Sequence, residues 1–455
     1  MKSNSINRYG LVIMVFALVL FTRFYNLEKQ LRFNRDESSD LVKIHQYWVD
    51  KDITLIGPMS EDGNMVYSSL SYYLIMPFAL LFNFTPVSPT IGNAFISIVG
   101  LLILIITTYL TNKRLTYLAC LLLVIWYPYL LSSRWAWNPN LIPALMAGGY
   151  FLLMSKKNLL TLLAGVLFGF TSHLHYLAII PSALFLFSAK NKILFILGFS
   201  IPILIFLTFD FFHPPGLFLS RTILYKQSSA TLDFNFEALS VGLKFLLTRA
   251  WILICCLPLL VNDIRFNRKN LLLLTPVLSL FIAVGFIKSP QGHYFIGALI
   301  PWYLWLILPR EKIWRWVQPI IFFLMVVINL PVSLNYLFGK IPDDSAYFAK
   351  RITNIIAQDI IDNELKNPNL AVLQSNDINS FGVKYRDILL VNDVRIRSID
   401  EYSVSDNLYV ITQEGDDKLL RGDPSVQMRL FNTGVIRFDQ TVSGSNWRII
   451  RFDRY

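Results

Sequence analysis

Between residues 9 and 338 the chain is a succession of apolar runs separated by short polar breaks. A membrane-spanning helix needs about 20 mainly apolar residues, and only helices or closed barrels satisfy the backbone amides inside a bilayer. Eleven runs are predicted to span the membrane: residues 9–25, 91–110, 115–132, 141–154, 159–172, 176–188, 193–212, 245–261, 271–287, 295–309 and 316–338. These eleven runs predict that the first 338 residues form a mainly α, polytopic bundle of transmembrane helices.

The remaining stretch, residues 339–455, has the mixed composition of a soluble protein. It begins with one segment of helical spacing, Asp344–Asn363. Short strands are predicted after it: Asn369–Ser375, Ile388–Val391, Asn407–Thr412, Gly434–Phe438 and Trp447–Phe452. We therefore expect a transmembrane domain at 1–338, with a first outer loop from about 26 to 90, and a small soluble α/β domain at 339–455.

The basic residues predict the orientation of the bundle. Their clusters lie at the N-terminus, Lys113–Arg114, Lys156–Lys157, Lys190–Lys192, Arg265–Lys269 and Arg310–Arg315. With eleven spans every cluster falls on the same face, which the positive-inside rule assigns to the cytoplasm. We expect a multi-pass plasma-membrane protein with a cytoplasmic N-terminus and an extracytoplasmic C-terminal domain. Although the net charge is +11, its spread over loop ends does not favour nucleic acid as a partner.

Two apolar segments need separate interpretations. The run at Leu11–Phe21 has no small-residue cleavage pattern after it, so we interpret it as an uncleaved first span. Counting Val66–Phe84 as a span would move the basic cluster at Lys113–Arg114 to the outer face. It is therefore predicted to be an interfacial or re-entrant helix, with an ordinary span as the alternative. Cysteines occur only within apolar runs, which predicts packed thiols rather than a disulfide framework: Cys120, Cys255 and Cys256.

The predicted outer loops contain most of the side chains that suit ligand chemistry. Asp36 and Glu37 follow the first span, beside Arg35. A carboxylate here can take a proton from an acceptor hydroxyl, although a solvated loop charge explains the pattern equally well. Glu61 and Asp62, in the same loop, are weak candidates for a divalent cation, and a polar turn is the better interpretation of that pair. No cofactor is predicted with certainty.

Three further outer loops carry candidate phosphate ligands. Arg134 lies between a serine and a tryptophan, where its guanidinium suits a phosphate oxygen or an interfacial anchor. His173 and His175 are two residues apart and do not share a helix face, so we expect one of them to reach a ligand and the other to be packed. His293 and Tyr294 suit an anionic headgroup, with interfacial anchoring of the tyrosine as the alternative.

The chain contains no phosphate-binding P-loop, dinucleotide fingerprint or nucleophile-elbow motif. It also lacks a soluble nucleotide-sugar domain. A transferase on the outer face has no access to cytosolic nucleotides. Such an enzyme would take its activated group from a lipid.

The order of these motifs resembles the C-type membrane glycosyltransferases, and in particular the protein-mannosyltransferase and aminoarabinose-transferase superfamily. The resemblance covers roughly residues 5–310. It rests on the Asp36–Glu37 pair, Gly57–Pro58, the aromatic segment Tyr67–Tyr73, Ser133–Arg134 and the His-containing loops. The sequence departs from the family pattern in the second outer loop, where Asn138 and Asn140 replace an expected acid.

The resemblance implies a polyprenyl-phosphate-linked sugar as donor and an inverting displacement at the anomeric carbon. It implies Asp36 as the base, Glu37 as its orienting partner, and Arg134, His175, His293 and Tyr294 as ligands of the lipid phosphate. The substrate pocket would be lined by Arg35, Tyr67, Trp137, Asn138, His173 and Gln291. The acceptor would be a lipid, a glycan or a protein. Membrane lipids would be further partners of the helical bundle.

Three rival functions remain open at this point. A lipid-linked-sugar flippase or polysaccharide transporter would need ionisable residues near the bilayer midplane, whereas most of them here lie at loop ends. An outer-face polymerase or ligase would need a large late loop, whereas the longest loop here is the first. A membrane-anchored binding protein would carry its activity in the tail, where no catalytic cluster is visible.

Overall fold

The computed structural model describes residues 3–59, 65–221, 230–231, 233–310, 314–373, 381–413, 426–431 and 434–454. The chain forms two compact units. The first, here called the membrane body, comprises Met1–Tyr25, Thr54–Ile75 and Thr90–Gly339. The second, the C-terminal unit, comprises Asn26–Ile53, Met76–Pro89 and Lys340–Tyr455. Two segments of the predicted first outer loop therefore belong to the same unit as the tail.

Helices form almost all of the membrane body. Its α-helices are α1 (Ser3–Phe24), α4 (Leu70–Leu81), α5 (Ser88–Thr111), α6 (Thr116–Ile125), α7 (Tyr127–Ser133), α8 (Ile142–Met154), α9 (Asn158–Leu174), α10 (Ile179–Ala183), α11 (Lys192–Phe212), α13 (Glu237–Leu247), α14 (Ile252–Phe266), α15 (Thr275–Gly285), α16 (Leu299–Ile307) and α17 (Trp314–Phe338), of which α4 and α5 begin or end in the C-terminal unit. Its 3₁₀ helices are η1 (Lys113–Leu115), η2 (Asn138–Leu141), η3 (Tyr176–Ala178), η4 (Leu184–Ser188), η5 (Arg268–Leu273) and η6 (Gly292–Ala298). One small hairpin joins β1 (Ile56–Met59) to β2 (Val66–Ser68).

Among the described residues, three helices are long and apolar enough to cross a membrane, namely α5, α11 and the part of α17 from Arg315. Two bent pairs raise the number to five if each pair is one span: η1 and α6 with α7, bent by 52°, and α13 with α14, bent by 89°. The other predicted spans coincide with shorter apolar helices or with chains of short helical pieces. The structure is thus a multi-pass helical bundle, but it does not confirm the count of eleven spans.

The segment Val66–Phe84 is not one long helix. Its first residues pair in the β1–β2 hairpin, and α4 follows with only 12 residues. At 1.5 Å per residue, α4 is about 18 Å long, shorter than a hydrocarbon core of about 30 Å. Other predicted spans contain helices as short as α15, with 11 residues, so the interfacial or re-entrant placement of α4 stays a prediction.

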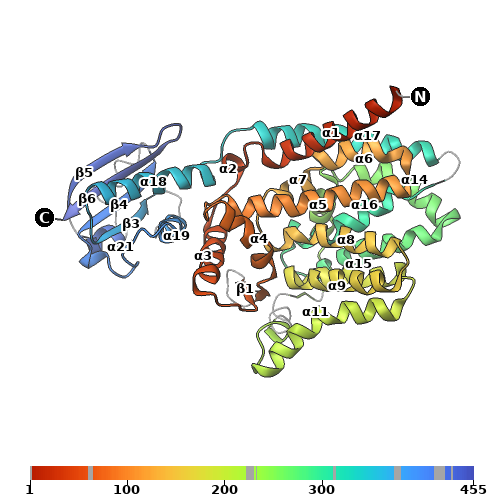
Figure 1. Cartoon of the computed structure of the whole chain (residues 1–455), viewed down its shortest axis with the longest axis horizontal. Helices are drawn as coiled ribbons and strands as arrows, with labels where there is room; N and C mark the ends of the chain where they lie inside the picture. The colour runs from red at the N-terminus through yellow and green to blue at the C-terminus, as the bar shows by residue number, and fades with distance from the viewer. Residues whose placement is uncertain are drawn as a thin grey trace. The chain divides into compact units, whose positions relative to one another are not determined.

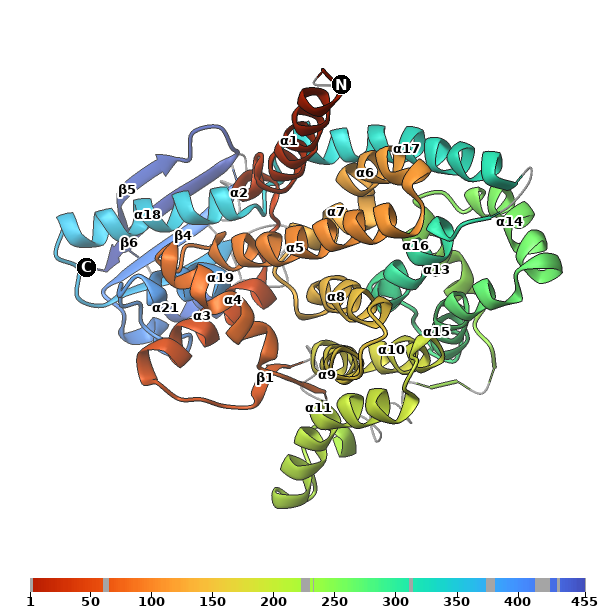
Figure 2. The same cartoon turned by 45° about the vertical axis from the view of Figure 1, so that its right-hand side comes forward.

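Close helix packing in the body depends on small residues. Helix α9 packs against α8 on one side and α11 on the other (Figures 1 and 2). A Cβ on Gly165 would lie 2.3 Å from the Phe195 carbonyl oxygen, and one on Gly198 would lie 2.1 Å from that of Leu162. The two backbones therefore touch directly, as in helix pairs inside bilayers, where packing rather than the hydrophobic effect drives association.

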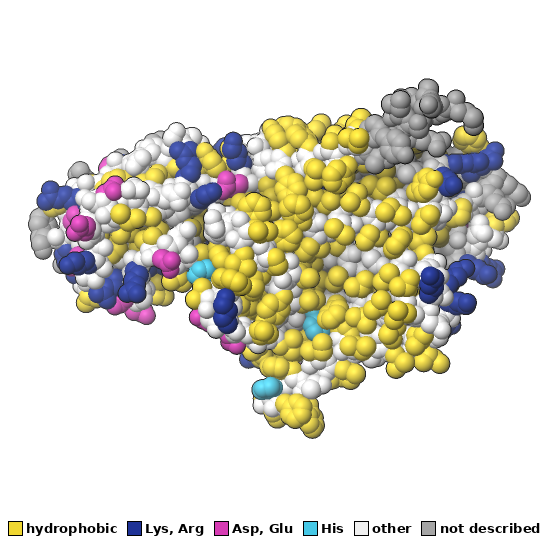
Figure 3. Space-filling view, viewed as in Figure 1, with side chains coloured by type: hydrophobic (Ala, Val, Ile, Leu, Met, Phe, Trp, Pro, Cys, Tyr) yellow, Lys and Arg dark blue, Asp and Glu magenta, His cyan; other side chains and the backbone are white. Residues whose placement is uncertain are grey.

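The outer surface of the body is apolar in stripes along its long helices. On α11 the exposed side chains include Ile193 at 71% and Phe211 at 77%, and on α17 they include Ile320 at 58%. Figure 3 shows hydrophobic side chains over most of the visible face of the body, with Lys and Arg gathered along its right-hand edge. A soluble monomer rarely exposes an apolar surface of this extent, so lipid is the solvent that fits it.

The C-terminal unit has a four-stranded sheet in the order β3–β4–β6–β5. Its strands are β3 (Pro368–Leu373), β4 (Asn407–Gln413), β5 (Gly434–Thr441) and β6 (Trp447–Arg454), with β3 and β4 parallel and the other pairs antiparallel. Its helices are α2 (Leu27–Gln30), α3 (Arg35–Asp50), α18 (Ala346–Asp362), α19 (Val383–Val391), η7 (Tyr402–Val404) and α21 (Val426–Phe431). Helix α3 packs against α19, which joins the segment after the first span to the tail.

Four of the five predicted strands of the tail are present, and one prediction was wrong. Ile388–Val391 forms the end of α19, not a strand. Tyr385, Ile388 and Leu389 are buried, a spacing of three and four residues that belongs to a helix. A run of four apolar residues is too short to show this period by itself.

Candidate active site

Six ring-bearing side chains from four separate segments meet in the membrane body. We call this set the aromatic cluster: Tyr67, Trp135, Trp137, His175, His293 and Tyr294. The His175 ring lies 5.7 Å from Tyr67, 5.8 Å from His293 and 5.7 Å from Tyr294, centroid to centroid. Trp137 contacts His293 edge to face at 4.5 Å and stacks on Trp135 at 4.6 Å. The predicted outer loops after α7, α9 and α15 therefore converge at one place.

Buried amides hold the loop that carries the two tryptophans. The side-chain amides of Asn93 and Asn140 both donate to the Trp135 carbonyl, at 3.0 and 2.8 Å. Asn138 is 4% exposed and donates to the Leu174 carbonyl at the end of α9. Asn138 thus ties the tryptophan loop to the segment that carries His175, which is how this predicted pocket residue acts in the structure.

The two histidines after α9 have different environments, as expected from their spacing. The His173 ring is 2% exposed and stacks on Phe206 at 4.0 Å. One ring nitrogen lies 3.0 Å from Ser68 Oγ and the other 2.9 Å from the Pro202 carbonyl oxygen. Both nitrogens are therefore occupied, and His173 is the packed member of the pair. His175, with its ring among Tyr67, His293 and Tyr294, is the member that reaches the cluster.

Arg134 is completely buried at the end of α7. Its two terminal nitrogens donate to the carbonyls of Thr22 and Tyr25, each at 2.8 Å, at the end of α1. Arg23 makes the complementary arrangement, donating at 2.6 and 3.0 Å to the Val124 and Leu123 carbonyls at the end of α6. These guanidinium groups cap the C-terminal ends of two helices, where positive charge is favourable. The phosphate role predicted for Arg134 stays a prediction.

The predicted catalytic carboxylates lie on the first turn of α3, in the C-terminal unit. Glu37 forms a capping box, with its Oε2 accepting from the backbone N–H of Asn34 at 2.8 Å. Asp36 and Arg35 are exposed. Both acids lie in the first turn, where a helix dipole favours negative charge. The structure thus gives Glu37 a structural role at the start of α3, beside an exposed Asp36.

A third carboxylate, which the sequence analysis missed, supports α3 from α19. Asp387 accepts a hydrogen bond of 2.6 Å from Ser38 Oγ. Burial raises the pKa of the Asp387 carboxyl, while Ser38 and the nearby Arg35 and Arg386 act in the opposite direction. No local motif marks this residue in the sequence, because its partner is 349 positions away.

Among the other predicted site residues, the Gln291 carbonyl accepts a hydrogen bond of 3.1 Å from the backbone N–H of Tyr294. Gln291 is exposed and precedes η6 without capping it through its side chain. Glu61 and Asp62, the weak metal candidates, lie outside the described residues. Within the residues that the structure describes, no group of three or more His, Cys, Asp or Glu side chains is placed to hold a metal ion.

Two solved structures share the architecture of this chain over nearly its full length. The structure of ArnT from Cupriavidus metallidurans bound to undecaprenyl phosphate matches with a TM-score of 0.63 and 10% sequence identity, covering 97% of this chain and 98% of that one. The apo structure of the same ArnT matches with a TM-score of 0.61 and 10% identity, covering 98% of each chain. No protein-family model matches the sequence, and no curated protein matches it significantly.

Proposed function

We propose that this chain, which has the fold of the C-type membrane glycosyltransferases, transfers a sugar from a polyprenyl-phosphate donor to an acceptor on the extracytoplasmic face. The observation that carries the proposal is the aromatic cluster. Two histidines and two tyrosines from separate segments meet there, at the predicted outer ends of the helices. Such an arrangement combines N–H and O–H donors with flat rings, which suits both a phosphate and a sugar.

The leaving group of the reaction is a lipid phosphate, and its negative charge grows as the sugar–phosphate bond breaks. In the proposed mechanism His293, Tyr294 and His175 donate hydrogen bonds to that phosphate. Donors already placed around a developing charge need little reorganisation during the reaction, and this is the usual source of electrostatic catalysis. Tyr67 and Trp137 supply ring faces for the sugar. The acceptor attacks from the opposite side and inverts the anomeric configuration.

In this proposal Asp36 takes the proton of an acceptor hydroxyl, and Glu37 orients the turn that carries it. If the acceptor is itself a phosphate, Asp36 positions it instead. Arg134 holds the tryptophan loop against the end of α1 through its hydrogen bonds to two backbone carbonyls. Arg134 can bind a phosphate only if phosphate oxygens replace those carbonyls as its hydrogen-bond acceptors. The C-terminal unit is proposed to be extracytoplasmic and to act on the acceptor side.

A donor-consumption assay tests the proposal. Purified protein in nanodiscs is incubated with a panel of polyprenyl-phosphate-linked sugars and with cell-envelope lipids and glycans as acceptors. Mass spectrometry then measures the polyprenyl phosphate released. The test variant is His293→Ala. The matched control is His213→Ala, because His213 is an exposed histidine at the end of α11 whose ring stacks on Phe209, which is not a member of the aromatic cluster.

We expect the wild type and His213→Ala to release polyprenyl phosphate at similar rates. His293→Ala should be slower by about 10²-fold or more, the typical cost of removing one transition-state donor. Equal rates in the two variants would contradict the assigned site. Movement of intact donor across sealed vesicles without release of polyprenyl phosphate would instead support a flippase.

A further inference from the structure

A second polar site lies at the other end of the membrane body, at a cavity of about 290 Å³. The cavity lies between the loop after α5 and the start of α17, and its lining includes Asn112, Arg114, Arg310, Arg315 and Gln318. Helix α5 separates it from the aromatic cluster. Asn93 near the start of α5 contacts the tryptophan loop, whereas Thr111, the last residue of α5, lines the cavity. From Asn93 to Thr111 the helix is about 27 Å long, and this length lies between the two sites.

The floor of this cavity is already neutralised. Asp263 and Arg310 are both fully buried and form an ion pair of 2.6 Å. The amide of Gln318 donates to the Leu306 and Leu308 carbonyls at 2.9 and 2.6 Å. These carbonyls lie at the C-terminal end of α16, the negative end of that helix. The fixed negative groups of the floor therefore have their partners within the protein.

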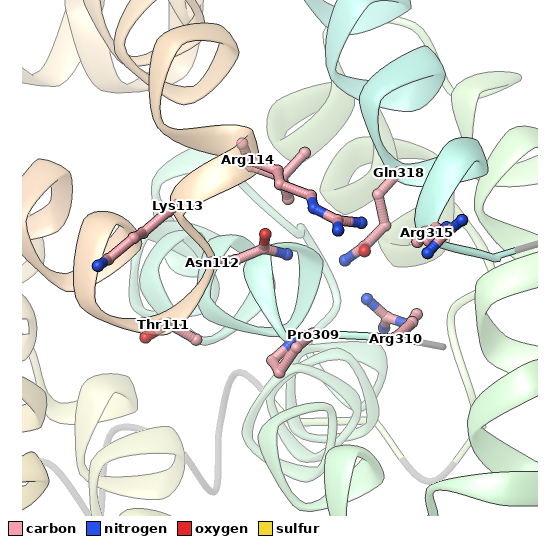
Figure 4. Close-up of a pocket in the computed structure, with 9 residues that line it drawn as sticks. Thr111, Asn112, Lys113, Arg114, Pro309, Arg310, Arg315 and Gln318 are labelled. Atoms are coloured by element: carbon pink, nitrogen blue, oxygen red, sulfur yellow. The ribbon is translucent and has the colours of Figure 1, made fainter. Parts of the chain in front are cut away.

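The mouth of the cavity is different, because the described residues supply no carboxylate partner for two arginines there. Arg114 and Arg315 are exposed, and neither forms an ion pair with a carboxylate within the described ranges. Figure 4 shows the guanidinium groups of Arg114, Arg310 and Arg315 around the same space, whereas Lys113 points away from it. A guanidinium fork matches phosphate oxygens in two hydrogen bonds.

Apolar side chains flank the same place. Tyr117, just after Arg114, is 60% exposed, and Trp316, next to Arg315, is 63% exposed. Exposed rings beside basic residues at helix ends are typical of the interface between headgroups and acyl chains. A soluble anion would make no use of this surface, whereas a lipid would use it for its acyl chains.

We propose that this cavity binds the phosphate of an anionic phospholipid headgroup, with Arg114 and Arg315 as its ligands. Arg310, held by Asp263, completes the wall without contributing net charge. Basic pockets between helices at the cytoplasmic surface are suited to anionic lipids, and the basic loops predict that this face is cytoplasmic. The site is distinct from the donor site and does not depend on the proposed transferase activity.

Binding of phosphatidylglycerol tests the proposal. The whole protein is reconstituted in phosphatidylcholine nanodiscs containing increasing fractions of phosphatidylglycerol, and native mass spectrometry measures retained lipid. The test variant is R114Q/R315Q. The control, K156Q/K157Q, removes two exposed charges from another predicted cytoplasmic loop. A third variant, R114K/R315K, keeps the charge but loses the forked geometry, and thermal unfolding monitors the fold of each.

We expect R114Q/R315Q to lower the affinity for phosphatidylglycerol at least about tenfold, the loss expected for one charge-assisted hydrogen bond. R114K/R315K should lie between this variant and the wild type, and K156Q/K157Q should match the wild type. Equal losses in R114Q/R315Q and the control would indicate general surface charge and overturn the proposal. Arginine-dependent binding of inorganic phosphate without a preference for phosphatidylglycerol would overturn the lipid assignment.

Discussion

Replacing Asp263 by asparagine should strongly destabilise the membrane body. The carboxylate is fully buried and accepts hydrogen bonds from Trp305 Nε1 at 2.9 Å and from Arg310 Nε and Nη2 at 3.2 and 2.6 Å. Two asparagine amides add further donors, from Asn262 at 3.2 Å and Asn270 at 3.1 Å. Asp263→Asn keeps the size of the side chain but removes its charge and turns one of its two acceptors into a donor.

The expected cost follows from the charge left behind. Removing one partner of a buried ion pair costs about 3–5 kcal/mol, because the remaining charge is buried without compensation. Here that charge is Arg310, whose side chain is 0% exposed. Changing Arg310 to methionine as well removes the unpaired charge. The double variant D263N/R310M should therefore be at least as stable as Asp263→Asn alone.

Thermal unfolding in detergent, followed by the loss of monodisperse protein, measures these effects. The matched control is Asp233→Asn, because Asp233 is an exposed aspartate of the same body and a surface substitution of this kind changes stability by about 0.5 kcal/mol or less. A double variant D263N/R310M that is less stable than Asp263→Asn alone would refute the reasoning. An Asp263→Asn protein as stable as the control would also refute it.

Three smaller changes have equally specific outcomes in thermal unfolding. Glu37→Ala should cost about 1 kcal/mol by removing half of a capping box, whereas Glu37→Gln should retain the bond from Asn34. The pKa of the Asp387 carboxyl is raised in the folded chain, so the folded state binds the carboxyl proton more tightly than the unfolded state does. The free energy of unfolding should therefore fall as pH rises from about 4 through the folded-state pKa. Asp387→Asn should flatten this fall, and an unchanged pH profile would exclude the residue as its source. Asn138→Ala loses the hydrogen bond to the Leu174 carbonyl and should cost about 1–3 kcal/mol of stability. It should also slow sugar transfer, because the tryptophan loop is held less firmly.

The sequence predicted helices well where an apolar run was long, and poorly where distant contacts break a run. Residues 91–110, 193–212 and 316–338 coincide with the three long helices α5, α11 and α17. The predicted span 245–261 instead bends sharply after Thr248, which has a φ of 62°. Its hydroxyl donates to Asn329, 81 positions away, at 2.7 Å. No local Gly or Pro marks this break, so periodicity alone gave no sign of it.

The sequence predicted the candidate site only in part, because loops on the same face of the membrane can meet whereas loops on opposite faces cannot. The loops with His175 and His293 were predicted to lie on one face, and their rings lie 5.8 Å apart; which side of the membrane they face stays a prediction. The partners of Arg134 were not predictable, because backbone carbonyls have no sequence signature, and the same is true of Arg23. In both cases a guanidinium without an acidic neighbour in the sequence binds the end of a helix.

The most direct test of the central claim is the binding of undecaprenyl phosphate to the purified protein, measured by native mass spectrometry. The account predicts saturable binding of one molecule at the aromatic cluster. H293A/Y294F should weaken it at least about tenfold, given a loss of about 1.5 kcal/mol or more per hydrogen bond to a charged group, and R114Q/R315Q should leave it unchanged. Undiminished binding by H293A/Y294F would contradict the account.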